Sequence, residues 1–217
     1  MKNKDDSSPI SHFLPFPFFL TINCKYLCIS ELCKKFVLFL RPLTGMQERR
    51  GDGRRVMDLS TETVARYDNG GSVLVYNAID RTTADFQRIL RCADFFARQG
   101  RRVVLPPKVD VPYKNPAYDR IYGSLRGTPY YGKCPDLCVD GVWYEHEGFS
   151  GNYPKRSFRN MCNHGFKQSS RIVIEDCGLT DGYMLRSLGG QRQAGVLMNE
   201  VWIHRDGKYQ PLYKTEG

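Results

Sequence analysis

The densest group of titratable side chains in this chain lies between Asp136 and Glu147. Asp136 is followed by a short apolar stretch, by the dipeptide Asp140-Gly141, and then by the run Glu145-His146-Glu147. Asp-Gly is favoured in two-residue hairpin turns, so we expect Asp136 and Glu145 to be neighbours on paired strands. Because side chains alternate along a strand, Glu145 and Glu147 should share one face and His146 should lie on the other.

These residues suit two kinds of chemistry. Clustered carboxylates bind divalent metal ions. A histidine beside carboxylates can instead act as a general acid or base without a metal, because its neighbours set its protonation state. A solvated strand edge with ordinary charges is a third interpretation, and the residues by themselves leave all three open.

A second polar cluster spans residues 167–171, where a helix is expected to lead into a strand. Its members are a lysine, an amide, two hydroxyls and an arginine: Lys167, Gln168, Ser169, Ser170 and Arg171. Cations and hydrogen-bond donors are the groups that a site needs in order to hold a phosphodiester. The alternative is a polar connection between two elements.

The charge balance favours a polyanionic partner such as nucleic acid, because 32 Lys and Arg stand against 23 Asp and Glu, a net charge of +9. Residues 108–132 are expected to be a loop-rich stretch, here called the basic loop, that interleaves tyrosines with cations. This pattern can stack bases and follow a phosphate backbone. Half of these tyrosines can instead pack on the sheet. The predicted nucleic-acid-binding residues are Lys114, Tyr118, Arg120, Tyr122, Arg126, Lys133 and Lys214.

Hydrophobic periodicity predicts the elements that must position these residues. Helices are expected over 84–99, 158–167 and 180–193, the first of them capped by Thr82 or Thr83. Strands are expected over 72–79, 101–105, 136–139, 142–147, 170–175, 199–204 and 209–214. This order predicts an α+β fold: a compact single domain with a central, largely antiparallel sheet flanked by two or three helices.

The first 45 residues differ in composition from the rest. They are apolar and cysteine-rich, but charges interrupt the apolar runs, so no stable membrane span is expected. We interpret 1–45 as a non-native or unstructured N-terminal extension, with Met46 as the true start; a short membrane-surface anchor is the alternative. Residues 46–71 are expected to form a basic lead-in arm, and 72–217 the folded domain.

Five cysteines lie outside the extension, at positions 92, 134, 138, 162 and 177. An odd number without a CxxC pair indicates neither a disulfide framework nor a structural zinc site. A zinc site using the CxxxC pair Cys134 and Cys138, with His146 and His164 downstream, is the alternative. Buried reduced thiols in a cytoplasmic protein are the favoured interpretation.

Four stretches, taken in order, resemble a known family. They read FFARQGRRVVLPP, KCPDLCVDGVWYEHEG, KQSSRIVIE and EVWIHRDGKYQPLY. Over roughly residues 86–214 the series resembles the C-terminal tRNA-nuclease toxin domain of CdiA-type contact-dependent inhibition proteins. The matching motif positions are Pro135, Asp136, Gln168, Ser170 and Arg171.

The resemblance implies a nuclease-like domain over 72–217, with the barnase/EndoU/colicin/RelE-like nuclease fold. It also implies metal-independent RNA cleavage without a cofactor, in which a 2′-hydroxyl attacks the adjacent phosphate. The implied substrate is tRNA, and the implied partner is a cognate immunity protein or antitoxin. On this interpretation the chain is a freestanding relative, from a mobile element or a toxin–antitoxin pair.

For that reaction the expected catalytic residues are Glu145, His146, Glu147, Lys167, Gln168, Ser170 and Arg171. His146 or Glu147 is predicted to be the general base, and the two cations are predicted to hold the phosphate. The reaction centre should therefore lie between the 145–147 strand and the 167–171 junction. His164 and His204 are expected to be dispensable, because neither belongs to a comparable polar cluster.

Two alternatives remain open. Pro135-Asp136, followed after eight residues by Glu145-x-Glu147, also resembles the signature of the PD-(D/E)xK nucleases, with Glu147 where that family usually has a lysine. That resemblance implies Mg²⁺ or Mn²⁺ bound by Asp136, Glu145 and the backbone carbonyl of His146. The other alternative is a non-catalytic, basic nucleic-acid-binding accessory protein.

Overall fold

A computed structural model describes residues 57–110, 115–149 and 153–215 of the chain. The chain divides into two compact units, residues 1–46 and 47–217, and every described residue belongs to the second. The interpretation of residues 1–45 and the role predicted for Lys114 therefore fall outside the described residues.

The described ranges contain eight strands, four α-helices and one short 3₁₀ helix. None of these helices is long and apolar enough to cross a membrane. In chain order the elements are β1 (Thr61–Arg66), β2 (Ser72–Tyr76), α2 (Ala84–Ala97), β3 (Arg102–Leu105), α3 (Ala117–Tyr122), η1 (Gly123–Leu125), β4 (Leu137–Val139), β5 (Val142–Glu147), α4 (Pro154–Gly165), β6 (Arg171–Glu175), α5 (Asp181–Gln193), β7 (Glu200–Arg205) and β8 (Lys208–Lys214).

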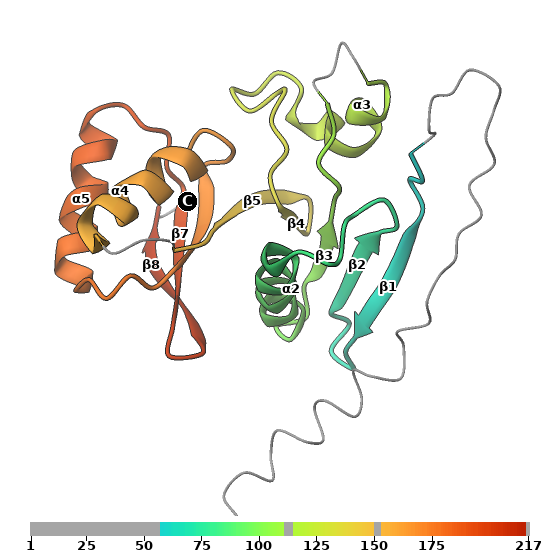
Figure 1. The fold of residues 1–217 in the computed structure, drawn as a ribbon, viewed down its shortest axis with the longest axis horizontal. Helices are drawn as coiled ribbons and strands as arrows, with labels where there is room; N and C mark the ends of the chain where they lie inside the picture. The colour runs from blue at the N-terminus through green and yellow to red at the C-terminus, as the bar shows by residue number, and fades with distance from the viewer. Residues whose placement is uncertain (1–56, 111–114, 150–152, 216–217) are drawn as a thin grey trace, which may run out of the picture. The chain divides into compact units, whose positions relative to one another are not determined.

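The strands pair in chain order, from β1 to β8, into one mixed sheet (Figure 1). The pairs β1–β2, β3–β4, β4–β5 and β7–β8 are antiparallel, and β2–β3, β5–β6 and β6–β7 are parallel. A parallel neighbour requires a crossover connection, and α2, α4 and α5 supply the three crossovers. The predicted α+β class, with a mostly antiparallel sheet and flanking helices, is confirmed.

Strand β5 belongs to both halves of this sheet. Its residues 142–144 pair with β4, whereas its residues 145–147 pair with β6. The strand therefore changes partner between Tyr144 and Glu145, where the run of charged residues begins. Figure 1 shows β5 passing from the β1–β4 half to the β6–β8 half.

Helix α2 covers one face of the sheet and joins its two halves. Its buried residues form a single core with β2–β5 and with Val173 of β6. The rings of Phe95 and Phe96 lie 5.4 and 5.6 Å from the ring of Trp202 on β7. Phe95 also stacks on Tyr209 of β8 at 4.7 Å. These contacts make the two half-sheets one domain.

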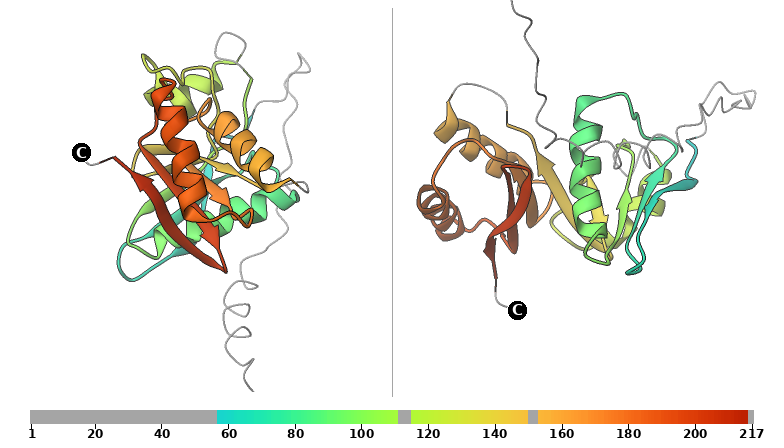
Figure 2. Two further views of the ribbon diagram at one scale, coloured as in Figure 1. Left: turned by 90° about the vertical axis from the view of Figure 1, so that its left-hand side faces the viewer. Right: turned by 90° about the horizontal axis from the view of Figure 1, so that it is seen from below.

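The opposite face carries two separate cores. Helices α4 and α5 pack on β6–β8 in a cluster that includes Ile172, and Figure 2 shows the two helices side by side on this half. Helix α3 and η1 form the other cluster, in which Tyr118 and Tyr122 pack against Trp143 of β5. Glu145 is the next residue after Trp143 on this face of β5, and it pairs with Ile172 of β6. The carboxylates of β5 therefore lie between the α3 cluster and the α4–α5 cluster.

Local signals in the sequence predict the starts of α2 and α5 and the two hairpins correctly. The side chains of Thr83 and Thr180 each accept a hydrogen bond from the backbone N–H three residues further on, which caps α2 and α5. The Asp140-Gly141 turn has φ values of 48° and 84°, and the Asp206-Gly207 turn has 51° and 72°. Positive φ at both central residues is the type I′ geometry of two-residue hairpins.

Three expectations about elements are wrong. Residues 46–71 are not an arm throughout, because 61–66 form β1, which pairs with β2 at the edge of the sheet. The stretch 108–132 is more than a loop, since α3 and η1 lie within it. Helix α4 begins at Pro154, earlier than expected, because proline is favoured in the first turn of a helix.

Candidate functional site on β5 and α4

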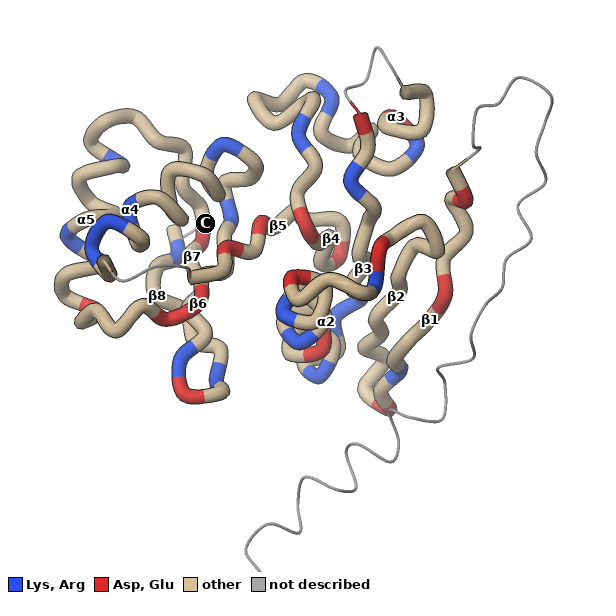
Figure 3. The backbone as a smooth tube through the Cα atoms, in the orientation of Figure 1, with Lys and Arg blue, Asp and Glu red and all other residues tan. Residues whose placement is uncertain are grey.

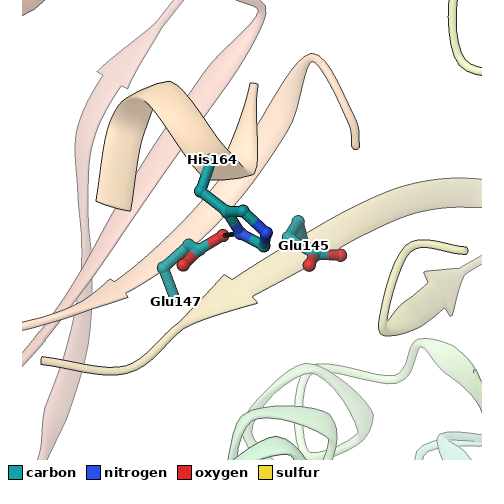
Figure 4. Close-up of side chains that lie close together, drawn as sticks. All are labelled: Glu145, Glu147 and His164. Atoms are coloured by element: carbon teal, nitrogen blue, oxygen red, sulfur yellow. Dashed lines mark hydrogen bonds and ion pairs between the residues drawn. The ribbon is translucent and has the colours of Figure 1, made fainter. Parts of the chain in front are cut away.

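Two glutamates of β5 and a histidine of α4 lie close enough together to hold one metal ion. One potential ligand atom from each of Glu145, Glu147 and His164 lies within 4.8 Å of the other two. Glu147 and His164 also contact each other directly, through a carboxylate oxygen and Nδ1 (Figure 4). We call these three residues the acidic cluster.

A lysine and an aspartate border the acidic cluster. Lys108, which follows β3, places Nζ 2.7 Å from Oδ1 of Asp136. The backbone N–H of Asp136 donates to Oε2 of Glu145 at 3.2 Å. The other carboxylate oxygen of Asp136 accepts from the backbone N–H of His146 at 3.0 Å. Asp136 and Glu145 are thus neighbours, as the hairpin signal predicts, and a cation stands beside them.

Electrostatics disfavour the ionised form of the buried carboxylates in this site. Burial raises the pKa of Glu145 well above its ordinary value, and the charges of Asp136 and Glu147 raise it further, while Lys108 lowers it. Burial also raises the pKa of Glu147, against the opposing effect of its contact with His164. A bound cation would relieve this repulsion, because it favours the ionised carboxylates.

Gly165 sets the separation of α4 from β5 and β6. A Cβ atom at this position would lie 2.8 Å from Cγ2 of Ile172 and 3.2 Å from Cγ of Glu147. The first distance is shorter than real Cβ contacts, so a side chain here would push the helix away. The close packing that glycine permits brings the preceding residue, His164, to Glu147.

A pocket of about 190 Å³ opens beside the acidic cluster. Its lining comes from the end of β5 and from α4: Glu147, Gly148, Ser157, Asn160, Met161 and His164. The His164 side chain is 63% exposed and that of Glu147 is 13% exposed. The cluster is therefore reached from the α4 side.

The chemistry of the donors fits a divalent ion. Carboxylate oxygens suit Mg²⁺ and Mn²⁺, and an added imidazole nitrogen also suits Zn²⁺. The ligand set differs in part from the one implied by the PD-(D/E)xK signature. Glu145 is common to both, but the carboxylate of Asp136 is engaged by Lys108 and by the N–H of His146, and Glu147 and His164 complete the cluster instead.

The side chain of His146 lies on the other face of the sheet, as strand alternation predicts. It is 3% exposed, and its Nε2 lies 3.2 Å from Oε1 of Glu175 on β6. The second carboxylate oxygen of Glu175 lies 2.7 Å from Nδ1 of His204 on β7. His146 is thus separated from the acidic cluster by the thickness of the sheet, which does not favour it as the general base.

The structure does not bring residues 167–171 to the acidic cluster. Arg171 shares the α2 face with Glu200, whose Oε2 lies 3.8 Å from its Nε. Ser170 is buried. Among the described residues, no side-chain hydrogen bond or ion pair joins Lys167 or Gln168 to the cluster. The contact of Lys167 is through the backbone, where its N–H donates to the carbonyl of His164 at 3.1 Å. No side-chain contact among the described residues therefore supports the reaction centre expected between the two segments.

Part of the predicted nucleic-acid-binding set is buried. Tyr118 and Tyr122 are fully buried and stack on each other at 5.2 Å, and the Tyr122 hydroxyl lies 3.1 and 3.4 Å from the carbonyls of Pro107 and Pro135. Their ring faces are therefore not available to a base. Arg126 pairs with an aspartate of α3. The exposed cations of this set within the described residues are Arg120, Arg126, Lys133 and Lys214.

Sequence reasoning missed two residues of the site. His164 was expected to be dispensable on the premise that it belongs to no polar cluster, and the premise is wrong, because it contacts Glu147. Lys108 was grouped with the basic loop, whereas it forms an ion pair with Asp136. The helical pattern around His164 predicts that its side chain is exposed. It does not predict the contact with Glu147, because no local rule pairs a helix residue with a strand residue 17 positions earlier.

Comparison with known proteins gives one structural similarity. The chain is similar to a solved structure described as a CdiA-CT/CdiI toxin and immunity complex from Burkholderia pseudomallei, with a TM-score of 0.39 and 16% sequence identity, over 64% of this chain and 91% of that one. No protein-family model and no curated protein matches the chain. A TM-score this low does not establish a shared fold, so the chemistry must be argued from the site itself.

Proposed function

We propose that this protein is a metal-dependent nuclease that hydrolyses phosphodiester bonds of RNA at the acidic cluster. The observation that carries the proposal is the convergence of Glu145, Glu147 and His164 within 4.8 Å, next to the Lys108–Asp136 ion pair. Buried carboxylates with raised pKa values, clustered beside an open pocket, are typical of functional sites. The net charge of +9 favours a polyanionic substrate.

Each residue has a role that follows from its place. Glu145, Glu147 and His164 would hold a divalent ion, which when bound supplies Lewis-acid polarisation of a phosphoryl oxygen. Asp136 orients this hairpin through its contacts with the backbone of His146 and with Glu145. Lys108 neutralises Asp136 and also donates to the carbonyl of Cys134 at 2.6 Å, so one of its three N–H groups would remain for a substrate phosphate.

A second candidate is the metal-independent reaction by 2′-hydroxyl attack. The contact between Glu147 and His164 favours it, because a carboxylate can orient an exposed imidazole as a general base. In this version His164 replaces His146 in the role predicted from the sequence. The burial of Glu145 beside Asp136 would then have no catalytic purpose, which is why we place this candidate second.

Chelation separates the two candidates. We expect cleavage of labelled tRNA to stop in EDTA and to return with Mn²⁺ or Mg²⁺. Glu145→Gln and Glu147→Gln should each lower the rate at saturating RNA by at least about 100-fold. The matched control is Glu62→Gln on β1, which should behave as the unmodified protein. Cleavage that survives EDTA would favour the second candidate, and binding without cleavage would leave only an accessory protein.

A protein partner follows from the sequence resemblance alone. A cognate immunity protein or antitoxin, if present, should block the acidic cluster or its pocket. Its test is inhibition of cleavage by a co-expressed candidate protein, with protection of α4 from hydrogen exchange as the structural readout.

A further inference from the structure

The exposed surface of α4 carries basic side chains and no acidic ones. From Tyr153 to Ser170 the chain contains Lys155, Arg156, Arg159 and Lys167 but no aspartate or glutamate. All four cations are exposed. Helix α5 continues this pattern after its first residue, with two further arginines and no carboxylate. Figure 3 shows basic positions along α4 and α5 and acidic ones on β5.

These cations are also free of carboxylate partners within the described residues. Arg126 and Arg205, for comparison, form ion pairs with aspartates at 2.6 and 2.8 Å. No such pair involves Lys155, Arg156 or Arg159 in this part of the chain, and Lys155 instead contacts the ring of Tyr183, 5.3 Å away. Unpaired cations on one helix leave a positive field that a polyanion can neutralise.

Helical geometry places Arg156 in line with the pocket. Residues four apart lie on one row of a helix, about 6 Å apart along its axis. Arg156, Asn160 and His164 form such a row, and the last two line the pocket. Lys155, Arg159 and Asn163 form the adjacent row. This row faces α5, since Lys155 lies over the ring of Tyr183 and Asn163 accepts from Gln191. Hydrogen-bond donors thus run along α4 from the acidic cluster to the start of the helix.

An exposed aromatic ring stands at the start of the helix. Tyr153 immediately precedes Pro154 and is 72% exposed, the most exposed of the large apolar or aromatic side chains in the described ranges. Tyr118 and Tyr122, by contrast, are fully buried. An open ring beside cations is a stacking platform for an unpaired base.

We propose that the exposed surface of α4, formed by Tyr153, Lys155, Arg156 and Arg159, binds single-stranded RNA and leads it to the acidic cluster. This inference rests on the proposed function, because the acidic cluster is where the RNA strand would be cut. The RNA-binding surface proposed here is α4, which follows β5, whereas the sequence predicted the basic loop before β4. The two cation rows contact phosphates, and the ring of Tyr153 stacks on a base.

The test measures RNA binding separately from cleavage. The full chain carrying Glu145→Gln is titrated into a fluorescently labelled single-stranded RNA, and anisotropy is recorded over a range of salt concentrations. The test variant adds Lys155→Gln, Arg156→Gln and Arg159→Gln. The matched control adds Arg66→Gln, Arg91→Gln and Lys208→Gln, which remove the same charge from exposed positions on β1, α2 and β8. Circular dichroism checks that both variants are folded.

We expect the α4 variant to lose about 100-fold in affinity at 0.1 M salt, and its log–log salt slope to fall by about 2, since each phosphate contact contributes about 0.7. The control variant should stay within about threefold of the parent. Tyr153→Phe should bind as the parent does, whereas Tyr153→Ala should lose roughly fivefold or more.

Several outcomes would overturn the proposal. Equal losses in the α4 and control variants would show that only net charge matters. An unchanged α4 variant, with a loss on replacing Arg120, Arg126 and Lys133, would return the surface to the basic loop. If double-stranded RNA bound as tightly as single-stranded RNA, stacking by Tyr153 would have no role. If no RNA bound at all, the basic surface of α4 would instead suit an acidic protein. Binding localised to α4 without cleavage by the unmodified chain would contradict the proposed function alone.

Discussion

Glu145 combines deep burial with two neighbouring carboxylates, and this placement has opposite consequences for stability and for ion binding. Its pKa is raised, so the folded protein holds a proton that the unfolded chain releases at lower pH. The free energy of unfolding therefore falls as pH rises above about 4.5, and it levels off once the folded-state pKa of Glu145 is passed. A metal ion reverses the preference, because it binds the ionised form.

We accordingly expect Glu145→Gln to raise the thermal midpoint of the metal-free protein at pH 7, while it abolishes the rise that Mn²⁺ produces in the unmodified protein. The amide keeps an oxygen that can accept from Asp136 N–H but carries no charge to bury. Differential scanning fluorimetry with and without Mn²⁺ checks both parts. A variant that is less stable without metal, or equally stabilised by it, would contradict this account.

The pH dependence of metal binding follows from the same residues. Burial raises the pKa of both Glu145 and Glu147, so protons compete with the ion above the ordinary range of a carboxyl. The apparent affinity for Mn²⁺ should therefore tighten as pH rises through these raised values and then level off. Isothermal titration calorimetry at several pH values measures this, and an affinity that is constant from pH 5 to pH 8 would be inconsistent with the cluster as the site.

His146 belongs to a different group, although it lies between the two glutamates in sequence. Burial alone would raise the pKa of Glu175, but the contacts with His146 and His204 lower it to about 2. The stabilisation from this depressed pKa is present above about pH 4.5 and is lost as pH falls through about 2. The group holds β5, β6 and β7 together on the α2 face.

Replacing His146 should therefore affect folding more than chemistry. We expect His146→Ala to lower the free energy of unfolding by about 1–3 kcal/mol, since it leaves a buried carboxylate oxygen without its partner. At a temperature where the variant remains folded, its rate at saturating RNA should stay within about tenfold of the unmodified protein. Urea unfolding and cleavage assays on one preparation check this, and a folded but inactive variant would restore His146 as the base.

At the level of elements, the site depends on the fit of α4 against β5. The fit is set by Gly165, above which Ile172 and Glu147 leave no space for a side chain. The donors of the site come from a strand and from the last turn of a helix, so a small displacement of the helix separates them. Position on a rigid pair of elements is what gives such a site its precision.

Gly165→Ala tests this dependence. The added methyl group should push α4 outward and separate His164 from Glu147, with a loss of about 1–3 kcal/mol in stability from overpacking. Affinity for Mn²⁺ should fall together with activity. Gly189→Ala on α5 is the matched control, because nothing lies within 4 Å of a Cβ atom there. Equal effects at the two positions would argue against the close contact.

At the level of the whole molecule, two elements join the half-sheets. Strand β5 pairs with both of them, and helix α2 packs across both of them. The partner change within β5 could divide the domain, but the α2 core includes side chains from both halves, such as Val75 of β2 and Val173 of β6. One continuous core on the α2 face therefore opposes independent unfolding. The site lies on the other face, where the apolar cover is interrupted.

This arrangement predicts a single cooperative unfolding transition. Trp143 reports on the α3 cluster and Trp202 on the core shared with α2. In Trp143→Phe and in Trp202→Phe, the fluorescence of the remaining tryptophan should follow the same urea curve as the far-ultraviolet circular dichroism of that variant. Separate midpoints in either variant would show that the halves unfold independently.

The sequence by itself determined the features that depend on near neighbours in the chain. The Asp140-Gly141 turn sets the register that places Asp136 beside Glu145, and alternation along β5 separates His146 from the two glutamates. The cap of α2 and the two hairpins were equally predictable, because each depends on a few consecutive residues whose backbone geometry is restricted by their types.

Only the tertiary structure decided which distant residues complete the site. The contacts of Lys108 with Asp136 and of His164 with Glu147 join separate elements, and so does the pairing of His146 with Glu175. Such contacts depend on how the crossover helices and the strands pack around the cores. No rule based on neighbouring residues predicts that packing. The burial of Tyr118 was equally hidden, because a tyrosine among cations has the same local pattern whether its ring faces solvent or a core.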